Sequence, residues 1–482
     1  MAGLLVTDGY KFSMAEAGWP LREETFYASH RKGGLQVLPF DVERELRAVL
    51  PMPEAGDWEF LAAHDYEMGA GFRAAIAQAQ QVKVSALPKL SVFHDREPIF
   101  SVTGPSAVVS WLEPLVLTWS YRIQVATIAL LRPDELPAAV GTVTCEAQKR
   151  LVLETLDTVG VKAPPIAVAP EAYVARVIAQ VKELAEVTGS PDRLFEVGLR
   201  AASCLEQHLL ALEGCRAAGL MRTSNVFGAR KLGMIPVGTM GHEHVQRFGS
   251  DEAAFRAMVE RRPQRSSFLL DTFDTIKSGI PTAYAIIKER PGLRDSIRYD
   301  SGDKEAQYRF AAKLAGELGI RPVMILEDSF DTALTKRFEE LRREVGWKPE
   351  EQVYGYGGFI VAQTAGTPIT RDRVSAVYKL TQTGKRPCMK FGNEAGSGKQ
   401  SVPGKPVLWR RRAGASGPFG VVAQEGEPVP EGYALLTGAA SSQAGARPAL
   451  DDAKEVRPED LRLVHSPATQ ALVDALKKEA FG

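Results

Sequence analysis

Acidic side chains follow three short apolar runs of this chain, each where the run ends. The runs and their acids are 267–270 with Asp271 and Asp274, 297–299 with Asp300 and Asp303, and 324–326 with Glu327 and Asp328. A single acid at a strand end often caps the next helix, and Asp303 suits that structural role. A cluster of acids on one rim suits a magnesium-bound, polyhydroxylated phosphate ligand, because carboxylates bind hard cations and ribose hydroxyls.

Two histidines and a glutamate follow another apolar run, 235–237, within the segment 238–244. The order His242-Glu243-His244 is not the zinc motif HExxH, and a His-x-His metal site would lack a nearby third ligand. A buried structural histidine is the common alternative. The glycines at 238 and 241 nevertheless leave room for a bulky anion beside His242. Both interpretations of this segment stay open at the level of residue types.

A glycine-rich segment, Gly355-Tyr356-Gly357-Gly358-Phe359, follows a later apolar run. Backbone amides without side-chain bulk can approach a phosphate group at such a place. A tight turn that needs positive φ is the structural alternative.

These residues need elements to position them, and the pattern from about 140 onward supplies parallel βα units. The expected strands are 194–197, 222–226, 235–239, 267–270, 297–299, 323–326 and 353–356. A helix is expected over 303–318, where apolar residues recur at steps of three and four and Gly319 can end it. The fold class is therefore α/β, with an irregular TIM-like barrel whose strand ends carry the site.

We predict three parts: an N-terminal α+β domain over 1–140, the barrel over 141–382, and a C-terminal segment over 383–482. The first part lacks the strand–helix alternation, and the last is rich in Gly, Pro and Ser. Strands near 376–380 and 406–409 are expected to pack on the N-terminal part, so that the additional domain combines both ends of the chain.

The composition is that of a globular protein, with 45% hydrophobic residues over 482 positions. Lys plus Arg number 59 and Asp plus Glu number 59, so the formal net charge is zero. Binding to nucleic acid is not expected, because it needs many uncompensated cations.

The cysteine pattern and the interrupted apolar segments predict a cytoplasmic location. Four cysteines occur, without CxxC spacing: Cys145, Cys204, Cys215 and Cys388. Charged residues interrupt the first 20 positions, which argues against a signal peptide. The apolar stretch 99–131 contains Pro105, Glu113, Pro114 and Arg122, so we expect buried helix rather than a membrane span.

Motifs in collinear order resemble the nicotinate phosphoribosyltransferase family over most of the chain. They are Thr7-Asp8-Gly9-Tyr10-Lys11, Thr103-Gly104-Pro105 with Glu113, Glu196-Val197-Gly198-Leu199-Arg200, Thr223-Ser224-Asn225-Val226, Gly238-Thr239 with His242, Leu269-Leu270-Asp271-Thr272, Arg298 with Asp300-Ser301-Gly302-Asp303, Tyr378-Lys379-Leu380, and Pro403-Gly404-Lys405. The resemblance implies an N-terminal domain, an irregular α/β barrel, and a homodimer with active sites at the interface.

The resemblance also implies the reaction, which belongs to NAD biosynthesis. Nicotinate and phosphoribosyl pyrophosphate would give nicotinate mononucleotide and pyrophosphate, with magnesium as cofactor and ATP hydrolysed as co-substrate. ATP would phosphorylate His242, and Asp300 would hold the ribose hydroxyls. Tyr10 of the neighbouring subunit would stack on the pyridine ring. The other residues expected to bind substrate are Arg200, Thr239, Asp271, Arg298, Ser301, Gly357 and Gly358.

The chemistry fits these residue types. The pyridine nitrogen carries a lone pair, so the displacement needs alignment and charge stabilisation rather than a general base. An arginine can bind the carboxylate of nicotinate through two parallel bonds, which the amide cannot reproduce. Imidazole is nucleophilic near neutral pH, as transient phosphorylation requires.

Two positions depart from the family pattern. Val197 stands where an aromatic usually sandwiches the ring, and Gly358 replaces a usual Thr or Ser. The Gly357-Gly358 pair is more similar to the sibling nicotinamide enzymes. A nicotinamide phosphoribosyltransferase is therefore one alternative, and a catalytically idle homologue that serves as a scaffold is another.

Overall fold

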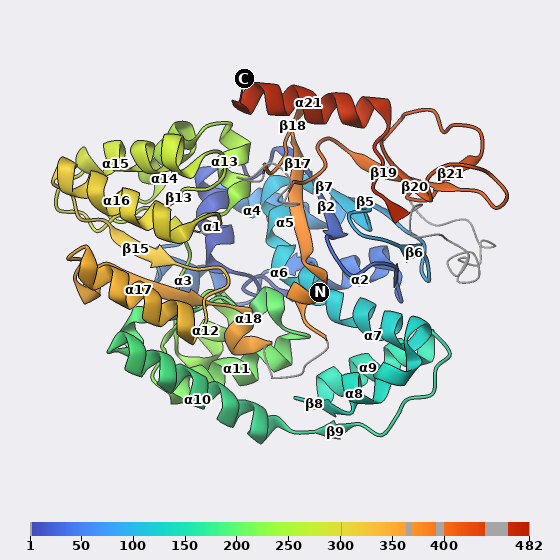
Figure 1. Cartoon of the computed structure of the whole chain (residues 1–482), viewed down its shortest axis with the longest axis horizontal. Coiled ribbons are helices and arrows are strands. Elements are labelled where there is room, and N and C mark those ends of the chain that lie inside the picture. The colour runs from blue at the N-terminus through green and yellow to red at the C-terminus, as the bar shows by residue number, and fades with distance from the viewer. Residues whose placement is uncertain (1, 300, 363–368, 392–399, 439–460, 482) are drawn as a thin grey trace.

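The computed structural model describes residues 2–299, 301–362, 369–391, 400–438 and 461–481. Figure 1 shows a parallel α/β part, whose helices form one side of the molecule, beside a part built from both ends of the chain. The candidate functional site lies where these two parts meet.

Seven parallel strands form the central sheet of the α/β part. They are β10 (Leu194–Glu196), β11 (Arg222–Thr223), β12 (Ile235–Pro236), β13 (Ser267–Leu269), β14 (Ser296–Tyr299), β15 (Val323–Leu326) and β16 (Gln352–Tyr356). Their spatial order is β12-β11-β10-β16-β15-β14-β13. All seven predicted strands are confirmed. A closed, TIM-like barrel is not, because β12 and β13 do not pair within the described residues and the sheet stays open there.

Helices connect the strands and cover the outside of the sheet (Figure 1). They are α10 (Pro170–Thr188), α11 (Leu205–Ala217), α12 (Val226–Leu232), α13 (His242–Phe248), α14 (Asp251–Arg261), α15 (Ile280–Lys288), α16 (Lys304–Leu318), α17 (Thr332–Glu344) and α18 (Gly358–Val361). The α16 helix begins and ends as predicted. The carboxylate of Asp303 accepts a bond from the Ala306 amide, and Gly319 adopts φ 68° after the last turn.

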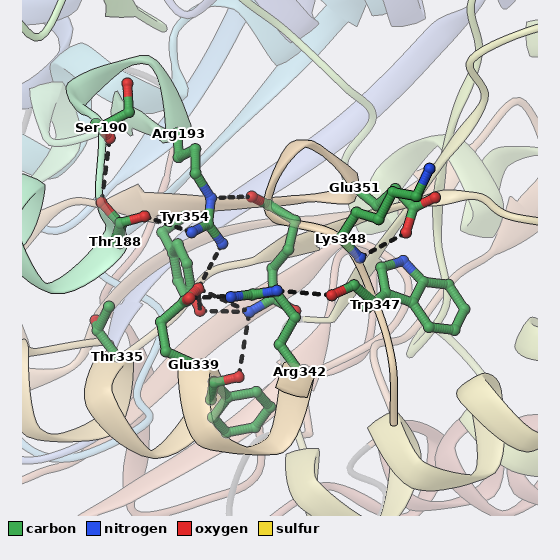
Figure 2. Close-up of polar contacts among 12 residues, drawn as sticks. Thr188, Ser190, Arg193, Thr335, Glu339, Arg342, Trp347, Lys348, Glu351 and Tyr354 are labelled. Atoms are coloured by element: carbon green, nitrogen blue, oxygen red, sulfur yellow. Dashed lines mark hydrogen bonds and ion pairs between the residues drawn. The ribbon is translucent and has the colours of Figure 1, made fainter. Parts of the chain in front are cut away.

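A polar network holds the amino-terminal ends of β10 and β16 against α17 (Figure 2). The guanidinium of Arg193 donates to the backbone carbonyls of Gln352, at 3.0 Å, and Thr188, at 2.5 Å. It also binds the carboxylate of Glu339, which accepts from Tyr354 as well. These bonds satisfy a buried charge and keep the strands in register below the site.

An antiparallel sheet of five strands forms the second part, in the order β18-β17-β2-β7-β5. Its strands are β2 (Glu23–His30), β5 (Lys83–Ala86), β7 (Phe100–Pro105), β17 (Ala376–Thr383) and β18 (Arg386–Pro387). β17 pairs with β2 over most of its length, so the return of residues 376–380 to the N-terminal part is confirmed.

The segment near 406–409 is also a strand, as expected. β19 (Pro406–Arg411) forms a separate sheet with β20 (Gly420–Gln424) and β21 (Tyr433–Leu435). Leu408 of β19 is fully buried in the same hydrophobic cluster as the N-terminal core. The guanidinium of Arg410 pairs with the buried carboxylate of Glu97 at 2.9 Å, which ties this sheet to the N-terminal part.

Smaller elements complete the described chain. The N-terminal part contains α1 (Gly9–Ala17), α2 (Val42–Val49), α3 (Asp57–Ala62), α4 (Ala70–Ala77) and the short strands β1 (Ala2–Gly3), β3 (Gln36–Val37), β4 (Pro51–Met52) and β6 (Val92–Phe93). In the sequence, four elements separate the N-terminal part from the parallel part: α8 (Leu136–Val140), β8 (Thr142–Val143), α9 (Glu146–Thr158) and β9 (Ala167–Val168). α19 (Arg371–Val374) precedes β17, and α21 (Pro467–Phe481) ends the chain.

The most apolar stretch is buried, as the sequence predicts. After β7 it forms α5 (Ser106–Trp111), α6 (Glu113–Thr118) and α7 (Ser120–Leu131). Within the described residues it is the one helical stretch long and apolar enough to cross a membrane, and 83% of its apolar window is buried inside the protein. The hydrophobic core accounts for this apolarity.

Candidate functional site

Two connected cavities occupy the parallel part and its border with the antiparallel sheet. The inner cavity, of about 460 Å³, is surrounded by side chains of all seven parallel strands or the residues that flank them, including Phe195, Ser224, Val237, Ser267, Ser296, Ile325 and Val353. The outer cavity, of about 570 Å³, lies between the carboxyl ends of these strands and β17, and its lining includes His242, Gly357, Gly358, Lys379 and Lys390. Five residues line both and mark the junction: Tyr10, Val197, Arg200, Arg298 and Glu327.

Arg298 reaches the junction from β14 and is 6% exposed. Its Nη1 donates to Oγ1 of Thr239 at 2.5 Å and lies 3.9 Å from Oε2 of Glu327. These two contacts place a guanidinium at the wall of the inner cavity. Such a group can bind a planar carboxylate through two parallel hydrogen bonds.

Arg200 lies in a 3₁₀ turn, Leu199–Ala201, that begins shortly after β10. Its guanidinium carbon is 5.8 Å from the ring centroid of Tyr10, within the range of a cation–π contact. Arg200 and Tyr10 thus lie on one wall of the junction.

The buried carboxylate of Glu196 shapes the turn that carries Arg200. It accepts bonds from the Gly198 amide and from the Thr223 hydroxyl, and it contacts Nε2 of His208 at 2.9 Å. Burial alone would raise the pKa of Glu196, but His208 and these hydrogen bonds outweigh it and keep the pKa below its ordinary value. A stable carboxylate therefore holds the start of the turn.

Tyr10 lies on α1 and lines both cavities of its own chain, whereas its expected contact with the ring bound by a neighbouring subunit stays a prediction. The amide of Gly9 donates to the carbonyl of Ser224 at 2.7 Å, which attaches α1 to the end of β11. The hydroxyl of Tyr10 donates to Oε2 of Glu113 at 2.7 Å. These two contacts fix the position of Tyr10 at the junction of its own chain.

Lys11 is 2% exposed and pairs with two carboxylates behind the outer cavity. Its Nζ lies 2.6 Å from Oε2 of Glu113 and 2.8 Å from Oε1 of Glu243. Burial by itself would raise the pKa of Glu113, but the charges of Lys11, Lys379 and Arg200 hold it well below its ordinary value of 4.5. This ion cluster joins α1, α6 and α13 around the site.

Replacing Lys11 with methionine is expected to lower the free energy of unfolding at pH 7 by about 3–5 kcal/mol, because two buried carboxylates lose their cation. The folded-state pKa of Glu113 is depressed in the wild type, so the stabilisation is present above about pH 4.5 and is lost as the pH falls. The difference between wild type and variant should therefore shrink below pH 4.5 in denaturant titrations.

Lys313→Met on the exposed face of α16 is the matched control and should change stability by less than about 0.5 kcal/mol. Its side chain is 77% exposed and lies 3.9 Å from Glu317. Equal losses at positions 313 and 11 would contradict the role assigned to the buried cluster.

Gly238 permits the close approach of α1 to the end of β12. A Cβ atom at this position would lie 2.3 Å from the amide nitrogen of Tyr10 and 2.5 Å from the carbonyl carbon of Gly9. Both contacts are with backbone, so no side-chain rotation can relieve them. The spacing between Tyr10 and Thr239 depends on this glycine.

Gly238→Ala is expected to destabilise the protein by about 1–3 kcal/mol and to reduce activity, because the overlap forces backbone shifts beside the junction. Gly316→Ala is the control, since a Cβ there meets nothing within 4 Å on the α16 helix. That control should stabilise by about 0.5–1 kcal/mol. Thermal unfolding and steady-state rates of both variants check the prediction, which is wrong if the two glycines tolerate alanine equally.

His242 begins α13 and lies at the border of the outer cavity, 8% exposed. Its Nε2 is 3.0 Å from Oδ1 of Asp271, whose Oδ2 accepts a bond from the Ser301 hydroxyl. Nζ of Lys390 also lies 3.0 Å from Nε2 of His242. One ring nitrogen cannot both donate to Asp271 and accept from Lys390, so the protonation state of the ring decides which of the two contacts forms.

His244 has a structural role and does not join His242 in a metal site. Its Nε2 lies 2.9 Å from the Ala254 carbonyl, and burial lowers its pKa to about 3, so the ring is neutral. Within the described ranges, no group of three or more His, Cys, Asp or Glu could hold a metal ion.

The acidic residues at the strand ends divide between two roles. Asp274 and Asp303 cap the helical turns that follow them, as the structural alternative predicts. Asp271 contacts His242 instead, whereas Glu327 and Asp328 line the outer cavity. Asp328 and its neighbour Ser329 have positive φ, 61° and 60°, a costly backbone conformation that is frequent at functional sites. Asp300 lies outside the described residues.

Cationic side chains that the sequence did not single out also line the outer cavity. They are Arg31, Lys32, Arg371, Lys379 and Lys390. Burial lowers the pKa of Lys379 to about 8, with Glu113 opposing this shift and Lys390 adding to it. Lys379 lies within the motif Tyr378-Lys379-Leu380, whereas no local pattern around Lys390 predicts its approach to His242.

Comparison with known proteins supports a single family. A scan against models of protein families gives no match for this chain. The chain is 32% identical to a nicotinate phosphoribosyltransferase of Bacillus subtilis, over 28% of each chain, and 29% identical to one of Mycobacterium tuberculosis, over 40% of this chain and 39% of that protein. It is 25% identical to the human nicotinate phosphoribosyltransferase over 89% of this chain and 80% of that protein. The matches thus span less than two thirds of the two bacterial relatives.

Solved structures agree on the fold. A nicotinate phosphoribosyltransferase from Porphyromonas gingivalis superposes with a TM-score of 0.60 at 18% identity, covering 83% of this chain and 96% of that one. A putative nicotinate phosphoribosyltransferase from Saccharomyces cerevisiae gives 0.61 at 17% identity, covering 82% and 94%. The two structures agree in fold with the sequence relatives named above, which show that the chain belongs to the nicotinate phosphoribosyltransferase family.

Proposed function

We propose that this protein transfers the phosphoribosyl group of phosphoribosyl pyrophosphate to nicotinate, forming nicotinate mononucleotide and pyrophosphate. The observation that carries the proposal is the junction of the two cavities, where Tyr10, Arg200 and Arg298 meet. An aromatic ring and two guanidinium groups at one place suit a flat, anionic heterocycle.

The pyridine ring would lie at the junction, with its carboxylate toward Arg298 and Thr239. Tyr10 is the one aromatic side chain among the five described residues that line both cavities, and Val197 contributes only a small apolar face. The ring would therefore be stacked on one side, by Tyr10, and packed against Val197 and Gly357 on the other. Such an arrangement would hold the ring without an aromatic side chain at position 197.

The phosphate groups would occupy the outer cavity. Lys379, Lys390, Arg31 and Arg371 offer positive charge there, and Gly357 and Gly358 leave their backbone accessible at its wall. Because the pKa of Lys379 is about 8, a bound phosphate would be held more weakly as the pH rises above that value. Asp300 and Ser301 follow Arg298, which lines this cavity, by two and three positions in the sequence, and they would bind the ribose.

Magnesium would enter with the substrate. Six carboxylates line the outer cavity, among them Glu327 and Asp328, but no described cluster forms a preassembled metal site. This donor set fits a cation held mainly by pyrophosphate oxygens and water, as magnesium prefers. The bound cation would neutralise charge on the departing pyrophosphate.

ATP would phosphorylate His242 and so couple its hydrolysis to the transfer. In the tautomer with hydrogen on Nε2, that hydrogen bonds to Asp271, and the lone pair on Nδ1 becomes the nucleophile. The ammonium of Lys390, 3.0 Å from Nε2 of the same ring, would add positive charge beside a phosphorylated imidazole. We also propose the homodimer that the family resemblance implies.

The decisive experiment gives the purified protein each base separately, with phosphoribosyl pyrophosphate, magnesium and ATP. Nicotinate should be converted to its mononucleotide at least about 100-fold more efficiently than nicotinamide, since the amide leaves Arg298 without a matching anion. Exclusive use of nicotinamide would favour the sibling activity. Turnover of neither base would favour the scaffold.

A further inference from the structure

Two cysteines occupy matching positions at the ends of two facing helices. Cys145 is the N-cap of α9 and Cys204 the N-cap of α11, both in extended conformation. Each follows a hydroxyl residue, Thr144 or Ser203, and in each case a glutamine three positions after the cysteine accepts bonds from the amide and the hydroxyl of that residue. The two caps, 59 residues apart in sequence, thus have the same construction.

The two sulfur atoms lie 3.8 Å apart, although both thiols are free. Cys204 is 8% exposed, whereas Cys145 is half-buried and lines an open surface pocket together with Glu146 and Glu206. A small reagent can therefore reach Cys145, and the sulfur of Cys204 stands directly behind it. The other thiols, Cys215 and Cys388, are buried elsewhere.

The surroundings distinguish the two thiols. Sγ of Cys145 accepts a bond from the Gln148 amide at 3.4 Å, at the start of a 13-residue helix whose dipole favours a negative charge. Contact with Cys204 and this amide lowers the pKa of the Cys145 thiol, whereas the same contact and burial raise the pKa of Cys204. Cys145 is thus the nucleophile and Cys204 the second thiol.

We propose that Cys145 and Cys204 are a modification site at which a peroxide forms a reversible disulfide. The Cys145 thiolate attacks one oxygen of hydrogen peroxide, the O–O bond breaks, and hydroxide leaves as water after taking a proton. The Cys204 sulfur then attacks Sγ of the Cys145 sulfenic acid, the S–O bond breaks, and the Cys204 proton leaves with the hydroxyl group as a second water. Two thiols and one peroxide give one disulfide and two waters.

Forming this bond requires movement close to the junction. The sulfurs must approach each other by roughly 1.8 Å, from 3.8 Å to the ~2.0 Å of a disulfide. Cys204 is four residues after Arg200, and Ala201 of the connecting segment lines the outer cavity. Oxidation should therefore displace the 3₁₀ turn that carries Arg200.

Thiol titration of the denatured protein tests the site without reference to activity. The wild-type chain should show four thiols before and two after treatment with hydrogen peroxide. Peptide mapping should find Cys145 linked to Cys204 with the loss of two hydrogens, and dithiothreitol should restore all four thiols. Four unchanged thiols, or a crosslink that involves Cys215 or Cys388, would overturn the proposal.

Serine variants keep the helix caps and separate the two roles. Cys145→Ser should keep its three thiols in peroxide, whereas Cys204→Ser should accumulate a sulfenic acid at Cys145 that dimedone traps. Cys388→Ser is the matched control and should still lose two of its three thiols. Equal loss of thiols in Cys145→Ser and in the control would overturn the assignment of Cys145 as the nucleophile.

The link to Arg200 rests on the proposed function and has its own measurement. Oxidised wild-type protein should bind nicotinate several-fold more weakly than reduced protein, with recovery in dithiothreitol, and Cys145→Ser should show no such change. Equal affinity of both forms would overturn the coupling to Arg200. Absence of nicotinate binding in both forms would overturn the proposed function, while the thiol titration would still decide the modification site.

Discussion

Replacing His242 with alanine is expected to abolish ATP-stimulated turnover while the protein stays folded. The imidazole contacts both Asp271, which can orient it, and Lys390, whose charge can attract a phosphoryl group. Loss of a covalent phosphoryl acceptor should lower the ATP-dependent rate by about 10²–10⁴-fold. The slower transfer without ATP should remain, because binding of the base at the junction does not need the imidazole.

Labelling with radioactive ATP measures the same step directly. The wild-type protein should acquire an acid-labile, base-stable phosphate that chases to inorganic phosphate, and the alanine variant should acquire none. His465→Ala is the control, because His465 lies just before α21 at 3.3 Å from Gln470 and is not among the described residues that line the two cavities. Survival of ATP stimulation in His242→Ala would remove the phosphohistidine from the mechanism.

Asp271→Asn probes how the histidine is oriented. The amide keeps the size of the carboxylate but cannot stabilise an imidazolium or favour hydrogen on Nε2. Phosphorylation should slow, with nicotinate binding unchanged, and a smaller effect than that of His242→Ala is expected. An unchanged labelling rate would show that Asp271 only holds Ser301.

The parallel strands could be predicted from the sequence because each leaves a local pattern. A run of β-branched or apolar residues, a polar end and a helical repeat mark most of the seven strands, and the capping of α16 by Asp303 and Gly319 follows from local chemistry. Closure of the sheet has no such local mark. It depends on whether β12 and β13 meet, and these strands, which α13 and α14 separate in sequence, do not pair within the described residues.

The site shows the same division between local and long-range information. Thr239 and His242 follow β12, and Arg298 lies near the carboxyl end of β14, so their shared location could be predicted from strand order. The approach of Lys390 to His242 joins positions 148 residues apart and has no local signature. The position of Tyr10 at the junction depends on the close approach that Gly238 permits and on the buried ion pairs of Lys11. Only the folded chain brings these residues together.

The second large effect is expected from replacing Arg298 with alanine. The variant should use nicotinate poorly and should lose most of its preference for nicotinate over nicotinamide. Two charge-assisted bonds to the carboxylate are worth about 3–4 kcal/mol, so kcat/KM for nicotinate should fall roughly 10²–10³-fold. The value for nicotinamide should change less than about tenfold, because the neutral amide gains little from the guanidinium. The ratio of kcat/KM for nicotinate to kcat/KM for nicotinamide therefore measures the contact with the carboxylate, because a general loss of folded protein would lower both values equally.

Folding needs a separate control, because Arg298 also faces the buried carboxylate of Glu327 at 3.9 Å. Arg298→Lys keeps a positive charge beside Glu327 but cannot form two parallel bonds to a carboxylate. It should fold as stably as the wild type and still lose most of the preference for nicotinate. If the lysine variant kept the full preference, charge alone would select the acid, and Arg200 rather than Arg298 would be the residue that recognises its shape.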